Sequence, residues 1–150
     1  MNVDQNGLEV LTRAECLDLL ASSTFGRIAL TSQALPLVLP VNYRYDGRSV
    51  VIRTNPGTKL DAATRHAVVA FEVDSIDPIY HCGWSVVVQG IARAVDDQDE
   101  IARLRQLPLS TWMPAAPDSY VAISLDIVSG RRIPKAHRQG VPFASARMGW

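Results

Sequence analysis

The sequence predicts a mainly β protein with flanking helices, built as one domain around a small closed or split barrel of about six antiparallel strands. Three observations lead to this class. Apolar and polar residues alternate in several short runs, Asp46-Gly47 marks a tight turn between two of these runs, and helix signals occur in between. A chain of 150 residues can bury a core of its own. Closing the sheet removes exposed strand edges, which favours a barrel.

The first expected elements are a short helix and two strands. Thr12 and Glu15 have the spacing of a capping box, so a helix is expected to begin after Thr12. Alternation over residues 27–31 and 36–43 predicts two half-buried strands. Pro40 has no N–H to donate to a strand ladder, and it therefore predicts a bulge or an unpaired edge.

A hairpin and a second helix follow. Asp46-Gly47 predicts a type I′ turn, which needs positive φ at both central residues. The strand over residues 49–54 is therefore expected to lie antiparallel to the strand before it. Two helix caps come next, Asn55 followed by proline or Thr58 one turn later, and with either cap a short helix opens here.

The second half of the chain predicts three more strands and one more helix. They are a central strand over residues 67–73, a long strand over 82–95 with a bend or bulge at Gly90, an exposed helix over 96–107 and a sixth strand over 119–129. Asp74 and Asp77, close to Glu72, are interpreted as a solvated acidic turn. The domain is thus expected to span residues 1–133, and residues 134–150 form a polar tail without periodicity.

Composition excludes several functional classes. The 15 basic and 15 acidic residues give a formal charge of zero, so no overall field attracts nucleic acid or an anionic membrane. No apolar run has the length of a membrane span and no signal peptide is visible, which predicts a cytoplasmic protein. Cys16 and Cys82 are expected to be reduced thiols. The histidines lack ligand spacing with these cysteines, so no metal site is predicted.

One short segment has the character of an anion site. Arg53, Thr54, Thr58 and Lys59 lie within seven residues, where a strand gives way to a helix. Backbone N–H groups, hydroxyls and two cations can converge on a phosphate at such a turn. The alternative interpretation is a solvated arginine at a strand end and an exposed lysine on a helix.

The order of motifs along the chain resembles the pyridoxamine 5′-phosphate oxidase-like family, the FMN-binding split-barrel proteins. The motifs are GRIAL, PVNY, VVIRT with the following GTK, AFEVD, GWSVVVQG and GRR, and together they cover most of the chain. Their order and spacing carry the resemblance. It is closest to an actinobacterial-type branch of uncharacterised members that bind flavin or deazaflavin.

The resemblance implies a homodimer of split barrels with FMN in the groove between the subunits. By position in the motifs, it implies that Arg53, Thr54 and Lys59 bind the phosphate. It also implies ring contacts, which are listed here: Pro40, Val41 and Asn42 border the flavin ring, Ser85 meets its polar edge and Trp84 forms a wall. Asn42 has the alternative role of stabilising a bulge at Pro40, and Trp84 that of a packing residue. Residues 135–150 do not reproduce the C-terminal pattern of the family's best-known oxidase, so oxidation of pyridoxamine phosphate is not predicted.

The predicted function is that of an FMN-dependent oxidoreductase acting on an unidentified small molecule. No side chain is assigned as catalytic, because the flavin itself carries the redox chemistry. One alternative is an F420-dependent reductase of the same fold, in which Arg44, Arg48 or Arg131 would meet the longer acidic tail of that cofactor. Another is a non-catalytic protein that binds flavin or haem. Arg131 and Arg132 are also compatible with contact to the ligand or the second subunit, or with a solvated strand end.

Overall fold

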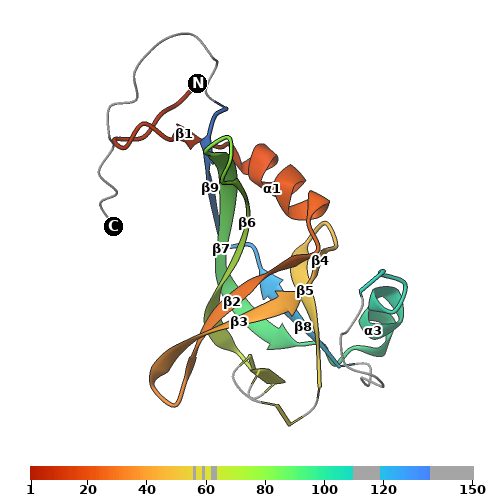
Figure 1. Cartoon of the computed structure of the whole chain (residues 1–150). Helices are drawn as coiled ribbons and strands as arrows, with labels where there is room; N and C mark the ends of the chain where they lie inside the picture. Colours follow the sequence, from red (N-terminus) through yellow and green to blue (C-terminus); the bar gives the residue numbers. More distant parts are fainter. Residues whose placement is uncertain (56, 59, 62–63, 110–118, 136–150) are drawn as a thin grey trace, which may run out of the picture.

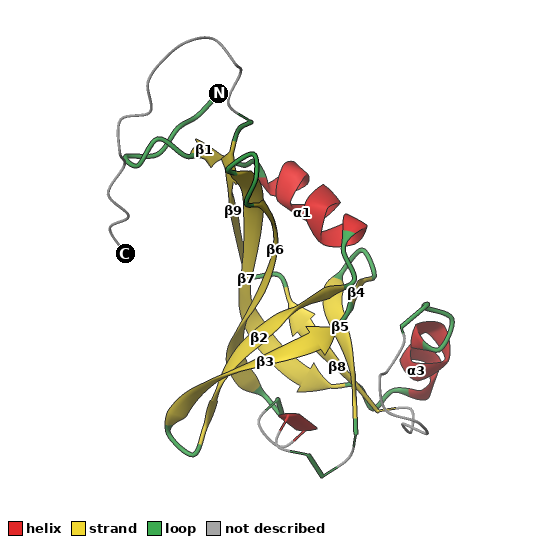
Figure 2. Ribbon diagram, in the orientation of Figure 1, coloured by secondary structure: helices red, strands yellow, loops and turns green. Residues whose placement is uncertain are grey.

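The computed structural model describes residues 1–55, 57–58, 60–61, 64–109 and 119–135. These residues form one curled antiparallel sheet with helices packed at separate places around it (Figures 1 and 2). The helices are α1 (Arg13–Ser22) and α3 (Gln98–Leu104). The strands are β1 (Glu9–Val10), β2 (Phe25–Ser32), β3 (Leu35–Asn42), β4 (Arg44–Tyr45), β5 (Ser49–Thr54), β6 (Ala67–Asp77), β7 (Cys82–Ala94), β8 (Ser119–Ser124) and β9 (Ile127–Ile133). The predicted mainly β, split-barrel class is confirmed.

The sheet has the order β3-β2-β6-β7-β8-β5-β4, and β9 pairs with both β7 and β1. Strand β7 organises this arrangement, because β6 accompanies it on one side while its other neighbour changes from β9 to β8. Gly90 lies at the change of neighbour, where a Cβ atom would overlap the carbonyl oxygen of Ser124. The pairing of Gly90 with Val69 continues the regular register, so the predicted bulge is absent here.

Two apolar clusters lie on opposite faces of the sheet. The larger one fills the barrel and includes Tyr43 and Phe71, whose rings meet edge to face with centroids 4.6 Å apart. The Tyr43 hydroxyl donates to the carbonyl of Leu20 at 2.6 Å, which ties α1 to this core. The smaller cluster lies outside the barrel, where α3 packs Ile101 and Leu104 against β5 and β8. We call the barrel side the core face and the opposite side the exterior face.

The predicted local signals are confirmed in part. Thr12 and Glu15 form the expected capping box at the start of α1. Pro40 lies in β3, the strand at the end of the sheet order, and pairs with Arg27 without a bulge, so the edge interpretation is correct. The hairpin at Asp46 is present, but only Gly47 has positive φ, so the turn is not type I′.

Three boundaries differ from the prediction. The late helix begins after Asp97, whose carboxylate accepts from the N–H of Glu100, and it is shorter than residues 96–107. The run 119–129 divides into β8 and β9. Strand β6 continues past residue 73 because β7 pairs with it through Asp77, so tertiary pairing holds polar residues in the strand. Among the described residues, no helix is long and apolar enough to cross a membrane.

Candidate functional site

The predicted ring-contact residues divide between the two faces of the sheet. Side chains alternate along a strand, and Val41 is buried in the core, so its neighbours Pro40 and Asn42 belong to the exterior face. In β7, Val86 is buried and Trp84 packs against the core cluster, which places Ser85 on the exterior face. Val41 and Trp84 therefore pack toward the core. Pro40, Asn42 and Ser85 lie on the exterior face, where Pro40 is exposed and the other two are half-buried.

The predicted phosphate-binding residues at the end of β5 also lie on different faces of the sheet. Arg53 is half-buried on the exterior face, with its guanidinium carbon 5.9 Å from the ring centroid of Tyr120. Thr54 is buried on the core face and donates to the Ser119 hydroxyl at 3.3 Å. Adjacent strand residues point in opposite directions, so in this conformation Arg53 alone of the two is presented to the exterior.

The turn after β5 is held by its own side chains. The Thr58 hydroxyl accepts from the N–H of Asp61 at 3.2 Å and donates to the Asn55 carbonyl at 2.9 Å, so Thr58 caps this turn. The buried Asp61 carboxylate accepts from the N–H of Gly57 at 3.0 Å, and this bond lowers the pKa of Asp61. The backbone N–H groups of this turn were predicted to bind a phosphate, but the N–H of Gly57 already donates to the Asp61 carboxylate. Lys59 lies outside the described residues.

The register of β4 and β5 places Asn42 and Arg53 near each other on the exterior face. Arg44 pairs with Val51 in antiparallel register, and Asn42 and Arg53 lie two residues beyond this pair on their own chains. Strands β3 and β5 also contact each other. The end of β3 therefore connects the predicted phosphate residue Arg53 with the predicted ring contacts.

Sequence reasoning missed a charged cluster on the same exterior face. Arg27 of β2 donates through Nη1 to the carboxylates of Glu72 at 2.9 Å and Asp74 at 3.4 Å, both on β6. Arg27 pairs with Pro40, and Asp74 pairs with Ser85, so the cluster lies between the predicted contacts of β3 and β7. Asp74 lies in β6, so its interpretation as part of a solvated turn was wrong, whereas Glu72 lies within the strand predicted over residues 67–73.

The carboxylates of this cluster outnumber its cation. Partial burial raises the pKa of Glu72 above its ordinary value, and the nearby charge of Asp74 raises it further, while the Arg27 contact opposes both effects. Two carboxylates share one guanidinium nitrogen here. The sequence signal for this cluster was the alternation of charged and apolar residues through Glu72, Val73 and Asp74, which is typical of a strand.

The remaining candidate arginines are held by specific partners. Arg131 donates to Asp4 at 2.9 Å, and Arg132 donates to Glu9 at 3.4 Å. Both lie near the end of β9 and are partly exposed, as a strand-end position predicts, but each is paired with an acidic side chain. Arg44 donates to the carbonyl of Pro108 at 2.9 Å.

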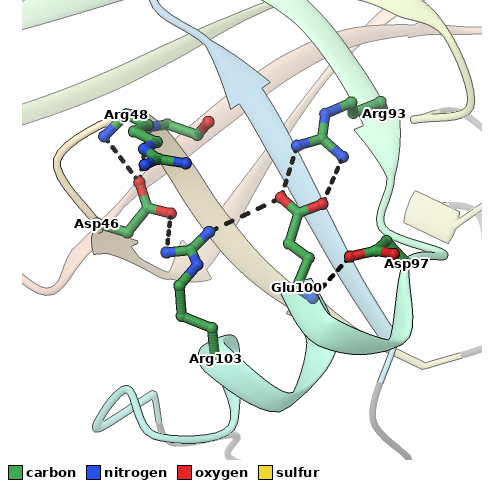
Figure 3. A network of polar contacts seen from close by, with 7 residues as sticks. Asp46, Arg48, Arg93, Asp97, Glu100 and Arg103 are labelled. Atoms are coloured by element: carbon green, nitrogen blue, oxygen red, sulfur yellow. Dashed lines mark hydrogen bonds and ion pairs between the residues drawn. The ribbon is translucent and has the colours of Figure 1, made fainter.

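A second charged network joins α3 to the sheet (Figure 3). Arg93 of β7 makes a forked pair with Glu100 at 2.7 and 3.1 Å. Arg103 donates to Asp46 at 3.0 Å, and Asp46 also accepts from the backbone N–H groups of Arg48 and Ser49. An open hollow of about 450 Å³ lies beside this network and is lined by Arg48, Arg93, Asp97, Asp99, Glu100 and Arg103. Its charges are largely paired with one another, which is typical of a structural network.

Other chemistry has little support in the described part of the chain. No group of three or more His, Cys, Asp or Glu side chains there has the arrangement of a metal site. Cys16 is buried beside Gly130, and this burial raises the pKa of its thiol. A thiol with a raised pKa is a poor nucleophile.

The chain belongs to the pyridoxamine 5′-phosphate oxidase family, because the sequence pattern of that family matches residues 12–132. This match runs from the cap of α1 into β9, so it includes both sets of predicted contacts. The resemblance stated on the sequence motifs is thereby confirmed.

Three proteins similar to this chain add detail to the family assignment. An uncharacterized protein of Mycobacterium tuberculosis is 44% identical over 129 residues, which make up 82% of this chain and 84% of the relative. The solved structure of an FAD binding protein from Mycobacterium smegmatis is 36% identical, has a TM-score of 0.72, and is matched over 82% of this chain and 96% of that chain. An FAD-binding protein from Mesorhizobium loti, 24% identical with a TM-score of 0.69, shares the fold over 85% of this chain and 99% of that chain.

Proposed function

We propose that this protein binds a flavin nucleotide on the exterior face of the sheet and uses it as an oxidoreductase. The observation that carries this proposal is the family match over residues 12–132. It is supported by the likeness to the FAD binding protein from Mycobacterium smegmatis, which is 36% identical. The predicted contacts Pro40, Asn42 and Ser85 share that face with Arg27, which adds a local chemical argument.

The residues present fit a flavin. A flavin ring needs a flat apolar surface and hydrogen-bond donors at its polar edge. The exterior face offers exposed apolar side chains such as Phe25 and Val38 together with the polar groups of Asn42, Ser85 and Arg27. A charge-assisted bond from Arg53 to the phosphate contributes about 1.5–3 kcal/mol.

FMN is the flavin nucleotide we propose first. Its phosphate would lie at the turn after β5, bound by Arg53 with Lys59, while Thr54 and Thr58 shape the turn through their internal bonds. Bound flavin supplies the capacity to accept and donate electrons. The side chains of this chain then orient the ring and exclude water, and the substrate is a small conjugated acceptor such as a nitro compound or a quinone.

The cofactor is tested by titration of the purified full chain. Flavin fluorescence and calorimetry are followed with FMN, FAD and F420 in separate and competing titrations. The proposal expects saturable binding of FMN with one site per chain. Stronger binding of FAD or F420 would assign the site to that nucleotide, and the absence of binding to all three would reject the proposal.

Turnover separates an oxidoreductase from a binding protein. With saturating flavin, NADH or NADPH and a panel of nitro and quinone acceptors, an oxidoreductase consumes the nicotinamide in steady state. A protein that binds flavin and turns over none of these acceptors would instead support the alternative of a flavin store or sensor. A haem titration monitored by absorbance tests the haem-binding alternative in the same preparation.

We further propose a homodimer in which a second copy covers the exterior face. Helix α3 covers this face only near β5 and β8. On β6 and β7 the paired residues Val68 and Ile91 are 79% and 48% exposed on the same face. Adjacent exposed apolar side chains of this kind are expected at an interaction site. A cofactor at this position would be enclosed between the two subunits.

The dimer is tested by the mass of the particle in solution. Light scattering after size exclusion is expected to give twice the chain mass for the wild type, and Val68→Glu is expected to give mainly monomer. Ile79→Glu is the matched control, since Ile79 is equally exposed but lies in the turn between β6 and β7. A monomeric wild type, or equal effects of both variants, would contradict the proposed interface.

A further inference from the structure

Arg27 of β2 lies on the exterior face on which the flavin is proposed to bind, and this inference rests on that proposed function. Directly across the strands, Arg27 faces Pro40 on one side and Glu72 on the other. Paired residues in antiparallel strands have Cβ atoms about 4.5–5.5 Å apart. A ring that borders Pro40 therefore lies within reach of the long Arg27 side chain.

The guanidinium of Arg27 retains donors for a ligand. Both contacts to Glu72 and Asp74 use Nη1, and the other two guanidinium nitrogens have no hydrogen-bond partner among residues 1–55, 57–58, 60–61, 64–109 and 119–135. The side chain is 43% exposed. The carboxylates therefore hold one corner of the guanidinium fork, and the N–H groups on its other two nitrogens can donate to a ligand.

We propose that Arg27 is a further flavin-contacting residue that presents positive charge to the polar edge of the ring, and that Glu72 is the positioning residue that holds the guanidinium and moderates its charge. No other cation joins Arg27, Glu72 and Asp74 in their ion pairs within the described part of the chain. On β7 the paired positions Val87 and Ser85 are uncharged. The next strand holds Arg131, whose charge is paired with Asp4.

The proposal has a definite electrostatic consequence. Uptake of two electrons and one proton leaves a flavin ring with one negative charge. A nearby cation stabilises this charged form more than the neutral oxidised form, and nearby carboxylates have the opposite effect. Arg27 should therefore raise the midpoint potential of bound flavin, and Glu72 should lower it.

The test measures affinity for FMN and the midpoint potential of bound FMN, with dithionite as the electron source and reference dyes of known potential. Arg27→Gln is expected to weaken FMN binding about tenfold and to shift the potential to more negative values. Glu72→Gln is expected to shift the potential to more positive values, and Arg27→Lys to retain most of the wild-type potential. Opposite shifts from the two partners of one ion pair distinguish this role from a purely structural one.

Arg93→Gln is the matched control, because Arg93 is also a strand arginine paired with a glutamate and is 45% exposed. It is expected to leave both quantities unchanged. Wild-type potential and affinity in Arg27→Gln, or shifts of the same sign in Arg27→Gln and Glu72→Gln, would overturn the inference while leaving flavin binding intact. If Arg27→Gln does not fold, as judged by circular dichroism, the sign of the shift in Glu72→Gln decides. Failure of the wild type to bind any flavin would reject the proposed function itself.

Discussion

The two arginine–carboxylate groups of the sheet have similar chemistry and different architecture. Around α3, Arg93 and Arg103 meet Glu100 and Asp46, so charges balance and Asp46 is only 3% exposed. On the exterior face, Arg27 alone meets Glu72 and Asp74. The balanced network closes on itself, whereas the unbalanced cluster keeps donors and net charge at an open surface. Charge balance and unused hydrogen-bonding capacity are the two features that separate the proposed flavin-facing cluster from the network around α3.

Gly90→Ala should have the largest effect, because Gly90 separates the part of β7 that carries Ser85 from the part that carries Arg93. The new Cβ would overlap the Ser124 carbonyl, so the strands must separate. We expect a loss of about 3 kcal/mol or more in the free energy of unfolding, measured by urea titration. In Gly47→Ala, where a Cβ meets no atom within 4 Å but φ is +91°, the expected loss is about 1 kcal/mol. Equal losses would contradict the close approach at Gly90.

Asp46→Asn tests the structural role of the network around α3. Burial raises the pKa of Asp46, but the N–H groups of Arg48 and Ser49 together with Arg103 outweigh this effect and lower it below 3.8. We expect Asp46→Asn to lose about 2 kcal/mol in the free energy of unfolding at pH 7, measured by urea titration. A lowered folded-state pKa stabilises the fold above the ordinary pKa, and this stabilisation disappears as pH falls through the folded value. The difference in the free energy of unfolding between Asp46→Asn and the wild type should therefore become smaller at acidic pH.

The affinity for FMN is the control for Asp46→Asn. It should equal that of the wild type, since the network lies around α3 and apart from Arg27. A loss of FMN affinity comparable to that of Arg27→Gln would show that the two regions are coupled.

Glu72→Gln should have the smallest effect on stability, below about 1 kcal/mol at pH 7, because its ion pair is partly exposed. The pKa of Glu72 is raised above 4.5 in the fold, so the folded state holds the proton more tightly than the unfolded chain. Its contribution to stability is therefore lost as pH rises through the folded value. Urea unfolding curves recorded between pH 4 and pH 7 should show that the free energy of unfolding falls less with rising pH in Glu72→Gln than in the wild type. An equal fall in both proteins would contradict the raised pKa.

Local signals in the sequence predicted those elements that local chemistry determines. The capping box at Thr12, the hairpin at Asp46 and the edge position of Pro40 each depend on a few adjacent residues. The extension of β6 beyond Asp74 to Asp77 depends on pairing with β7 and has no local signal. Turn geometry at Gly47 was also missed, because the Asp46 carboxylate binds the turn's N–H groups directly.

The candidate site was predictable to a smaller extent. Motif order selected seven of the candidate residues without indicating the direction of their side chains. The structure presents Pro40, Asn42, Arg53 and Ser85 on one face, while the side chains of Val41, Thr54 and Trp84 point toward the core. The Arg27–Glu72 contact joins residues 45 positions apart in sequence, and only the pairing of β2 with β6 brings them together.

A crystal structure of the full chain grown with excess FMN tests the central claim most directly. The account predicts the ring against the exterior face of β3 and β2, with its polar edge within hydrogen-bond distance of the Arg27 guanidinium. Flavin bound elsewhere, such as in the hollow beside α3, with Arg27 making only its contacts to Glu72 and Asp74, would contradict it.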